Sequence, residues 1–355
     1  MTEPRTAHPL SRGELREAIS CLPRFPLAHL PTPLEHLPRF SHVLGGPEIY
    51  IKRDDCTGLA LGGNKTRHNE FLIADALNDG ADIIVWGAGV QSNNCRQTAA
   101  ACAKAGLDCH LVLGRGKPAQ GPDVVQGNLL LDHLVGAHVD IVEEAIGPEL
   151  DRRILAEAEK HRARGRKVYC WHRPRVTPLA AISYAVCLLE VLDQMDDLNA
   201  VPAAVYGSSA GSTGAGLELA KAALGLNLPI RHIAPMDWPW DTQADMAQIA
   251  TDAGRLIGLD LPIAPECVDV TFEHIGPAYG VTSPGCLEAI ALLARTEGIL
   301  LDPYYSGKAM AGLIDDIRRG RHTAADQVVF IHTGGTPVLF ACHEELTRGI
   351  AARQL

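Results

Sequence analysis

Short apolar runs recur along this sequence and alternate with stretches of helical composition. The runs cover residues 82–86, 109–113, 139–142, 167–170, 203–206 and 328–332, and the helical stretches include residues 94–105 and 217–224. A further strand-like segment lies at 48–52. Apolar residues within the runs are continuous rather than alternating, which is typical of strands in a parallel sheet buried on both faces. Alternating strands and helices predict an α/β fold whose sheet is mostly parallel and doubly wound.

The length of 355 residues predicts about two domains. A hydrophobic share of 46% and a charged share of 21% exclude a disordered chain. No linker marks a domain boundary, but residues 152–166 predict a long helix that precedes a change in character. We therefore expect a discontinuous arrangement, in which a small domain at 58–165 is inserted into a large domain formed by 1–57 and 166–355.

The net charge of −10 argues against nucleic-acid binding, because an acidic surface repels phosphate backbones. The sequence has no uninterrupted apolar window of about 18–20 residues that would predict a membrane span, and residues 1–22 lack the apolar core of a signal peptide. The ten cysteines are scattered singly, which is typical of reduced thiols. These features predict a soluble, cytoplasmic protein.

Lys65 follows Gly-Gly-Asn at the predicted start of a helix. The positive end of that helix and the nearby Arg67 would both lower the pKa of the lysine, favouring the neutral amine that a Schiff base requires. An exposed lysine in a first helical turn fits the same spacing.

Gln91, Ser92 and Asn93 follow the predicted strand at 82–86 and precede a helix. Their hydroxyl, amides and backbone N–H groups would form a cradle for a carboxylate or a ring oxygen at the end of the sheet. A helix cap without a ligand is the alternative.

The glycine-rich segment at 207–216 follows the predicted strand at 203–206 and also precedes a helix. Free backbone N–H groups and Ser/Thr hydroxyls at a helix N-terminus bind phosphate. The segment lacks the Gly-Lys-Ser/Thr of a Walker loop and does not read G-x-G-x-x-G, so a single phosphate suits it better than a dinucleotide. A closely packed turn is the alternative.

Further hydroxyl groups lie near predicted strand and helix ends at Tyr305, Ser306 and Thr333. A buried tyrosine is most often part of a core, so these residues alone do not define a site. His332 is better explained as a packed strand residue than as a base. The Cys-Trp-His triplet at 170–172 offers too few ligands for zinc, and we expect no metal site.

Taken together, these segments resemble the fold-type II pyridoxal-phosphate enzymes, and more narrowly the 1-aminocyclopropane-1-carboxylate (ACC) deaminase and D-cysteine desulfhydrase family. The resemblance runs from about residue 30 to residue 335 and is most specific at 51–67, 91–93 and 296–313. It implies a tryptophan-synthase-β-like fold with two doubly wound α/β domains and the cofactor in the cleft between them. The large domain would bind the cofactor and the small domain the substrate, in a homodimer.

The same resemblance implies that Lys65 binds pyridoxal 5′-phosphate covalently and moves a proton. Asn64 would hold the ring oxygen, and Thr333 and Ser306 would lie near the pyridine nitrogen. The loop expected to hold the phosphate comprises Ala210, Gly211, Ser212, Thr213 and Gly214. Ser92 and Asn93, with Gln91, would receive the carboxylate of a small amino-acid substrate, Ser92 would also carry a proton, and Tyr305 would lie above the cofactor.

Two departures from the family pattern bear on the substrate. Deaminases that open the cyclopropane ring have Glu at the position of Ser306, and a hydroxyl cannot keep the pyridine nitrogen protonated, so the ring withdraws electrons less strongly. His172, Arg173 and Arg175 lie where relatives usually have a Gly-Gly-Ser turn. If they face the cleft, they suit a second anionic group such as a sulfonate or carboxylate; exposed arginines on a rearranged loop are the alternative.

We therefore expect a pyridoxal-phosphate-dependent lyase that catalyses β-elimination from a small amino acid and releases pyruvate and ammonia. The leaving group would be a thiol, as in D-cysteine, or a sulfonate, as in cysteate. ACC deamination and β-replacement are the alternatives with the same cofactor. A non-catalytic protein that binds the cofactor or an amino acid is the alternative of another class.

Overall fold

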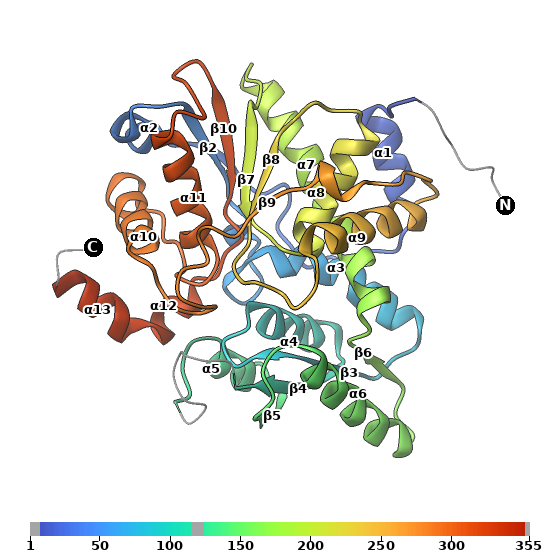
Figure 1. Ribbon diagram of the computed structural model, residues 1–355. Coiled ribbons are helices and arrows are strands. Elements are labelled where there is room, and N and C mark those ends of the chain that lie inside the picture. The colour runs from blue at the N-terminus through green and yellow to red at the C-terminus, as the bar shows by residue number, and fades with distance from the viewer. Residues whose placement is uncertain (1–7, 116–123, 352–355) are drawn as a thin grey trace.

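The computed structural model describes residues 8–115 and 124–351, which form two sheets (Figure 1). The larger sheet has the strand order β1-β2-β10-β7-β8-β9, and its pairs are parallel except for β1 with β2. Its strands are β1 (Leu34–His36), β2 (Glu48–Lys52), β7 (Ala204–Ser208), β8 (Ile230–Ile233), β9 (Asp269–Thr271) and β10 (Gln327–Ile331). The smaller sheet has the order β5-β4-β3-β6 and is parallel throughout. Its strands are β3 (Ile83–Gly89), β4 (Asp108–Gly114), β5 (His138–Val142) and β6 (Val168–Cys170).

Helices connect the strands and cover both sheets. They are α1 (Arg12–Ile19), α2 (Pro38–Leu44), α3 (Asn64–Asn78), α4 (Asn93–Ala105), α5 (Gly127–Leu134), α6 (Pro148–Ala163), α7 (Arg173–Asp197), α8 (Ser212–Ala223), α9 (Thr242–Leu256), α10 (Pro284–Glu297), α11 (Ser306–Arg318), α12 (Pro337–Ala341) and α13 (His343–Ala351). The α/β class and the doubly wound, mostly parallel arrangement are confirmed.

Strand β10 illustrates why the apolar runs are continuous. Val329 and Ile331 pack into the core formed with α7, α8 and α9, whereas Val328 and Phe330 pack into the core formed with α10 and α11. Successive side chains of a strand point to opposite faces, so a strand covered on both faces is apolar at every position. Figure 1 shows these two groups of helices on opposite sides of the larger sheet.

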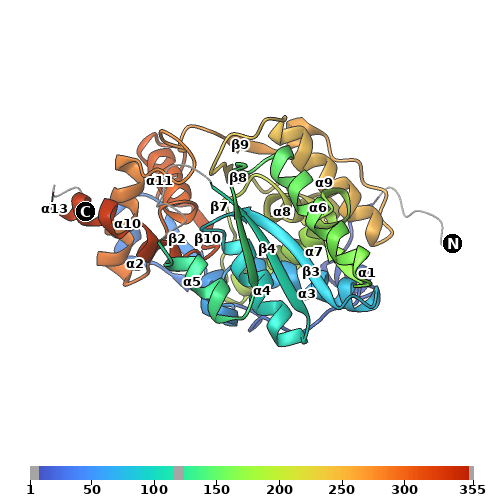
Figure 2. The same ribbon diagram turned by 90° about the horizontal axis from the view of Figure 1, so that it is seen from below.

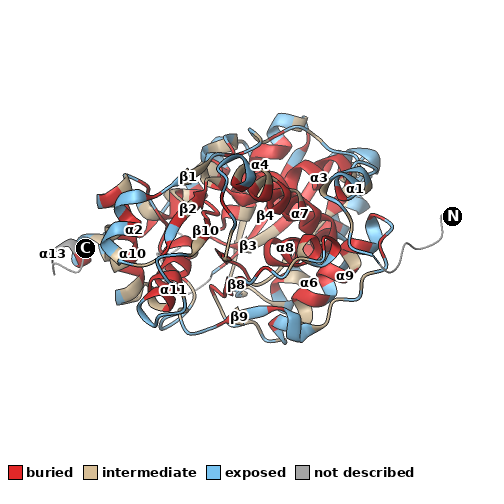
Figure 3. Cartoon of the chain, turned by 90° about the horizontal axis from the view of Figure 1, so that it is seen from above, coloured by how far each residue is buried: buried red, intermediate tan, exposed pale blue. Residues whose placement is uncertain are grey.

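The smaller sheet is covered in the same way. Ile83 and Val85 of β3 pack against α6, whereas Ile84 and Trp86 pack into the core shared with α3 and α4. Figure 2 shows α4 and α6 on either side of this sheet, and Figure 3 shows the buried residues concentrated where strands and helices meet.

Helix α7 joins the two sheets. It follows directly after β6 of the smaller sheet and packs against α3, α8 and α9. Among the described residues, α7 is the helix long and apolar enough to cross a membrane, but 83% of its most apolar window is buried inside the protein, as in a core helix.

The division into sheets does not follow the expected domain boundaries at every point. Strand β6 pairs with β3, so residues 168–170, which we expected in the large domain, lie in the smaller sheet. The assignment of 58–165 to a small domain, and of 1–57 with 166–355 to a large one, otherwise stays a prediction.

Candidate active site

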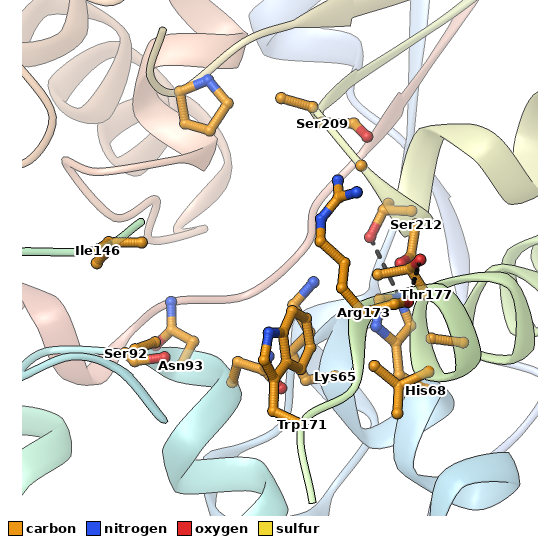
Figure 4. A pocket seen from close by; sticks show the side chains of 18 of the residues that line it. Lys65, His68, Ser92, Asn93, Ile146, Trp171, Arg173, Thr177, Ser209 and Ser212 are labelled. Atoms are coloured by element: carbon orange, nitrogen blue, oxygen red, sulfur yellow. Dashed lines mark hydrogen bonds between the residues drawn. The ribbon is translucent and has the colours of Figure 1, made fainter. Parts of the chain in front are cut away.

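A cavity of about 250 Å³ is lined by residues of both sheets. It lies where β3 and β7 end, which is where open parallel sheets bind their ligands. The expected site residues that line it are Asn64, Lys65, Ser92, Asn93, Arg173, Ala210, Gly211, Ser212, Thr213, Tyr305 and Thr333. Figure 4 shows Lys65 and Arg173 projecting between Ser92 and Asn93 on one side and Ser209 and Ser212 on the other.

Lys65 is the second residue of α3, and burial lowers the pKa of its ammonium group to about 8. The expected contribution of Arg67 to this shift is wrong. The Arg67 guanidinium is buried beneath the helix, where it lies 2.8 Å from a carboxylate oxygen of Asp54 and 2.7 Å from one of Glu190. These carboxylates therefore balance the positive charge of Arg67, and desolvation favours the neutral amine of Lys65.

Two glycines bring the segment around Lys65 against the end of β10. Gly63 has φ +123°, and a Cβ on Gly334 would lie 2.6 Å from the Cα of Gly63, so neither position has room for a side chain. This close approach allows the N–H of Asn64 to donate to the carbonyl of Thr333 at 3.0 Å. The Gly-Gly-Asn-Lys and His-Thr-Gly-Gly motifs, which are distant in sequence, thus form one wall of the cavity.

The glycine-rich loop presents the start of α8 to the cavity. The cap residue Gly211 has no side chain, and the backbone N–H groups of Ser212 and Thr213 in the first turn are available to an anion. The amide of Asn64 donates to the Thr213 hydroxyl at 3.0 Å and ties the loop to α3. Gly214 does not line the cavity, and its N–H donates to the Ser209 hydroxyl at 2.6 Å.

Ser92 caps α4 and also lines the cavity, so a role as a helix cap and a role in binding a ligand do not exclude each other. Its oxygen accepts the N–H of Cys95 at 3.1 Å, and a hydroxyl that accepts can still donate. Asn93 accepts an N–H from the Asn128 amide at 2.9 Å through its side-chain oxygen, which leaves its NH₂ as the donor toward the cavity (Figure 4). Gln91 lies behind this surface, and its amide bonds to the backbone of Gln126 and Asn128.

Tyr305 and Ser306, adjacent in sequence, have different surroundings. Tyr305 lines the cavity, and its hydroxyl lies 2.5 Å from that of Tyr279. Burial and the Tyr279 hydroxyl raise the pKa of Tyr305 well above its usual value, so the phenol stays protonated and can donate. Ser306 is buried away from the cavity, where its hydroxyl bonds to Asp302.

These features fit pyridoxal phosphate. An amine of lowered pKa suits a carbonyl group, and the N-terminus of α8, whose cap residue is a glycine, suits a phosphate. The buried Ser208 hydroxyl, at the base of the glycine-rich loop, has no hydrogen-bond partner among the described residues and is a further polar group for a ligand to satisfy.

Comparison with known proteins agrees with this fit. Residues 26–334 match the family described as pyridoxal-phosphate dependent enzyme. The chain belongs to this family. It is 38% identical over 330 residues to D-cysteine desulfhydrase from Salmonella typhi, with 90% of this chain and 96% of the relative covered. The homologue from Salmonella newport has the same identity and coverage. These relatives place the chain in the ACC deaminase and D-cysteine desulfhydrase family, as a pyridoxal-phosphate-dependent lyase.

Solved structures place the fold with fold-type II enzymes, as expected. A crystal structure described as an ACC deaminase homologue superposes with a TM-score of 0.85 at 30% identity, covering 94% of this chain and 98% of that one. The processed form of threonine deaminase isoform 2 from Solanum lycopersicum has a TM-score of 0.66 at 17% identity, covering 99% and 92%, and shows the fold alone.

His172, Arg173 and Arg175 lie where we expected relatives to have a Gly-Gly-Ser turn, and they do not all face the cavity. Arg173 lines it, but its guanidinium forms two hydrogen bonds to Asp245, at 2.7 and 2.5 Å. Arg175 points to α3, where it bonds to Asp75 at 2.9 Å. His172 is exposed and caps α7 only through its backbone.

Several residues that line or support the cavity of this enzyme were not expected from the sequence. Tyr279 lies in a segment without strong periodicity, and Asn128 acts from behind the Ser-Asn turn. All four tryptophans line the cavity: Trp86, Trp171, Trp238 and Trp240. The rarity of tryptophan in this chain and the Trp-Pro-Trp segment at 238–240 are the signals that could have pointed to them.

Proposed function

We propose that this enzyme removes a thiol from the β-carbon of an amino acid of the cysteine type and releases pyruvate and ammonia. The observation that carries the proposal is the placement of Lys65, with a pKa lowered to about 8, in one cavity with the Ser92–Asn93 turn and the phosphate-type loop. A lysine of that pKa is about one-tenth deprotonated at pH 7, against about one in three thousand for an ordinary lysine.

Pyridoxal phosphate, when bound, withdraws electrons from the α-carbon of an amino acid and so makes its α-proton acidic. The neutral amine of Lys65 is the base placed to accept that proton at Nζ. Ser92 and Asn93 supply a hydroxyl and an NH₂ donor that would hold the substrate carboxylate and fix the orientation of the α-carbon. The protonated phenol of Tyr305 provides a donor for the departing sulfur.

A thiol leaving group is favoured over a sulfonate by the charges around the cavity. A sulfonate calls for an unopposed cation, but Arg173 already forms a bidentate ion pair with Asp245. Arg175 pairs with Asp75 and Asp79 outside the cavity. Cysteate-type substrates, and a second anionic group on the substrate, therefore rank below cysteine-type substrates in this proposal.

The test is an assay of the purified holoenzyme with D-cysteine, L-cysteine, cysteate and ACC. We expect sulfide and pyruvate in equal amounts from one enantiomer of cysteine, and no turnover in Lys65→Ala. Lys104→Ala removes an exposed lysine from α4 and serves as the matched control. Formation of 2-oxobutanoate from ACC without pyruvate from cysteine would make the enzyme a ring-opening deaminase. Turnover by Lys65→Ala would refute the assigned base.

A further inference from the structure

The four tryptophans of this chain form a tryptophan box on one cavity: Trp86, Trp171, Trp238 and Trp240. Aromatic residues make up only 5% of the sequence, so abundance does not explain the cluster. Trp86 and Trp171 meet edge to face, with ring centroids 4.9 Å apart and planes at 84°. Trp238 and Trp240 stack at 4.8 Å and 10°.

The box is built from three separate segments and extends the apolar wall of the cavity. Trp86 belongs to β3, Trp171 lies between β6 and α7, and Trp238 and Trp240 lie between β8 and α9. Further apolar lining comes from Leu72, Ile146, Leu150, Val176, Met236 and Ile249. Trp171, Trp238 and Trp240 are partly exposed, whereas Trp86 is 1% exposed and supports Trp171 from within the core. The thiol of cysteine is a single sulfur atom and cannot cover an indole ring, whereas a bulky apolar substituent gains free energy from the exposed indole surface that it buries.

The indole nitrogens allow, but do not require, an acceptor atom on such a substituent. Nε1 of Trp86, Trp238 and Trp240 is buried and has no hydrogen-bond acceptor within the described part of the chain. Such a donor can bind an acceptor atom of a ligand, whereas the apolar surface of the cavity defines the class of substituent.

The charges beside the box favour an uncharged substituent. The guanidinium of Arg173 lies 4.8 Å from the ring centroid of Trp240, so a cation already occupies that indole face. Asp245 neutralises this arginine, so its guanidinium is not an unopposed positive charge for an anion beside the box. Asp151 also lines the cavity, and a carboxylate there repels anions further.

We propose that the natural substrate is an S-substituted cysteine whose sulfur carries an uncharged aromatic group, and that this group lies in the tryptophan box. The proposal rests on the proposed lyase function and narrows its substrate class. The α-proton passes to Nζ of Lys65, a double bond forms between Cα and Cβ, and the Cβ–S bond breaks with its electron pair on sulfur. The thiolate gains a proton, and water hydrolyses the released enamine to pyruvate and ammonia, so no oxidant or reductant is needed.

The test compares S-benzylcysteine with S-methylcysteine and S-carboxymethylcysteine, each as both enantiomers, on the holoenzyme. All three release alkyl thiols, so differences in kcat/KM report on the pocket more than on the leaving group. We expect kcat/KM for S-benzylcysteine to exceed that for S-methylcysteine at least about tenfold. The ratio should fall about tenfold in Trp238→Leu and Trp240→Leu, and Trp240→Phe should retain most of it. Phe340→Leu removes an aromatic ring that is 67% exposed on α12 and is the matched control.

A kcat/KM for S-benzylcysteine that is no higher than that for S-methylcysteine in the wild-type enzyme would overturn the proposal. A preference for S-carboxymethylcysteine would also overturn it, and so would an unchanged ratio of the first two kcat/KM values in both Trp238→Leu and Trp240→Leu. If none of the compounds releases pyruvate, the proposed lyase function is refuted. Calorimetric titration of the holoenzyme then tests separately whether the tryptophan box binds an aromatic group. Tighter binding of S-benzylcysteine than of S-methylcysteine then supports the aromatic pocket, and equal binding refutes it. Circular dichroism establishes that each variant is folded.

Discussion

The hydroxyl of Ser306 lies 2.6 Å from a carboxylate oxygen of Asp302, and both residues are fully buried. The same carboxylate accepts the backbone N–H groups of Tyr304, Tyr305 and Ser306. Ser306 is thus part of the hydrogen-bonded start of α11 rather than of the cavity wall. The residue that we expected near the pyridine nitrogen is held by a neighbouring carboxylate.

Replacing Ser306 should therefore affect the free energy of unfolding more than the rate of the catalysed reaction. We expect Ser306→Ala to lower the free energy of unfolding by about 2 kcal/mol, because it removes the hydroxyl that donates to the Asp302 carboxylate and accepts the backbone N–H of Asp302. Ser306→Glu places a second carboxylate beside the buried first one and should cost about 3 kcal/mol or more. Urea denaturation measures both. A Glu variant as stable as the wild type would show that this position tolerates the deaminase pattern.

The buried ion pairs under α3 should be among the most sensitive positions. Burial alone would raise the pKa of Asp54, but the charge and hydrogen bonds of Arg67 outweigh it and lower the pKa. Arg67→Met should cost about 3–5 kcal/mol of stability, because it leaves the buried Asp54 carboxylate without its ion-pair partner, while Glu190 keeps Lys52 at 2.8 Å. Arg152→Met removes an exposed partner of Glu149 and should stay within about 0.5 kcal/mol. If denaturant titrations show equal losses of stability for Arg67→Met and Arg152→Met, burial is not the reason why the Arg67 ion pairs matter.

The lowered pKa of Lys65 predicts how cofactor attachment depends on pH. The neutral amine is the reactive form, so the rate at which the apoprotein takes up pyridoxal phosphate should rise with pH and level off above about 8. For an ordinary lysine the rate would keep rising toward pH 10.5. Stopped-flow absorbance, with borohydride trapping and peptide mapping to Lys65, measures this. A midpoint near the ordinary value would contradict the buried environment.

Asn128 should act as a positioning residue for the substrate carboxylate. Its NH₂ donates to the Gln91 carbonyl at 2.8 Å and to the Asn93 side chain at 2.9 Å. Asn128→Asp replaces this donor by an acceptor, which frees Asn93 to rotate. We expect KM for amino-acid substrates to rise about tenfold and kcat to fall less, a loss of ground-state binding. Asn78→Asp, at the exposed end of α3, is the control, and a fall in kcat alone would contradict this role.

The sequence was sufficient for the strands that are buried on both faces. The apolar run at 328–332 corresponds to β10, because a strand covered on both faces needs apolar residues at successive positions. The strand-like segment at 48–52 corresponds to β2, although it begins with Glu48 and ends with Lys52. Strands β1, β8 and β9 were not predicted. Each is only three or four residues long, and β1 and β9 lie at the edges of the larger sheet, where burial imposes no continuous pattern.

The candidate site was predictable where backbone chemistry defines it. Lys65, Ser92 and the loop before α8 lie at helix starts, and helix starts have local sequence signals. The directions of Arg67, Arg173 and Arg175 were not predictable, because each pairs with a carboxylate far away in sequence: Glu190, Asp245 and Asp75 respectively. The tryptophan box likewise forms only when three distant segments fold together.

Helix α7 starts at Arg173 on the cavity wall and carries Tyr184 and Glu190 to the ion pairs under α3, where the Tyr184 hydroxyl donates to Asp54 at 2.6 Å. The seventeen steps along the helix from Arg173 to Glu190 span about 26 Å. The end of α7 that lines the cavity is thus remote from the part that is anchored under α3. Residues 171–173 can accordingly be exchanged during evolution, or by an engineer, to alter selectivity while the lysine stays in place.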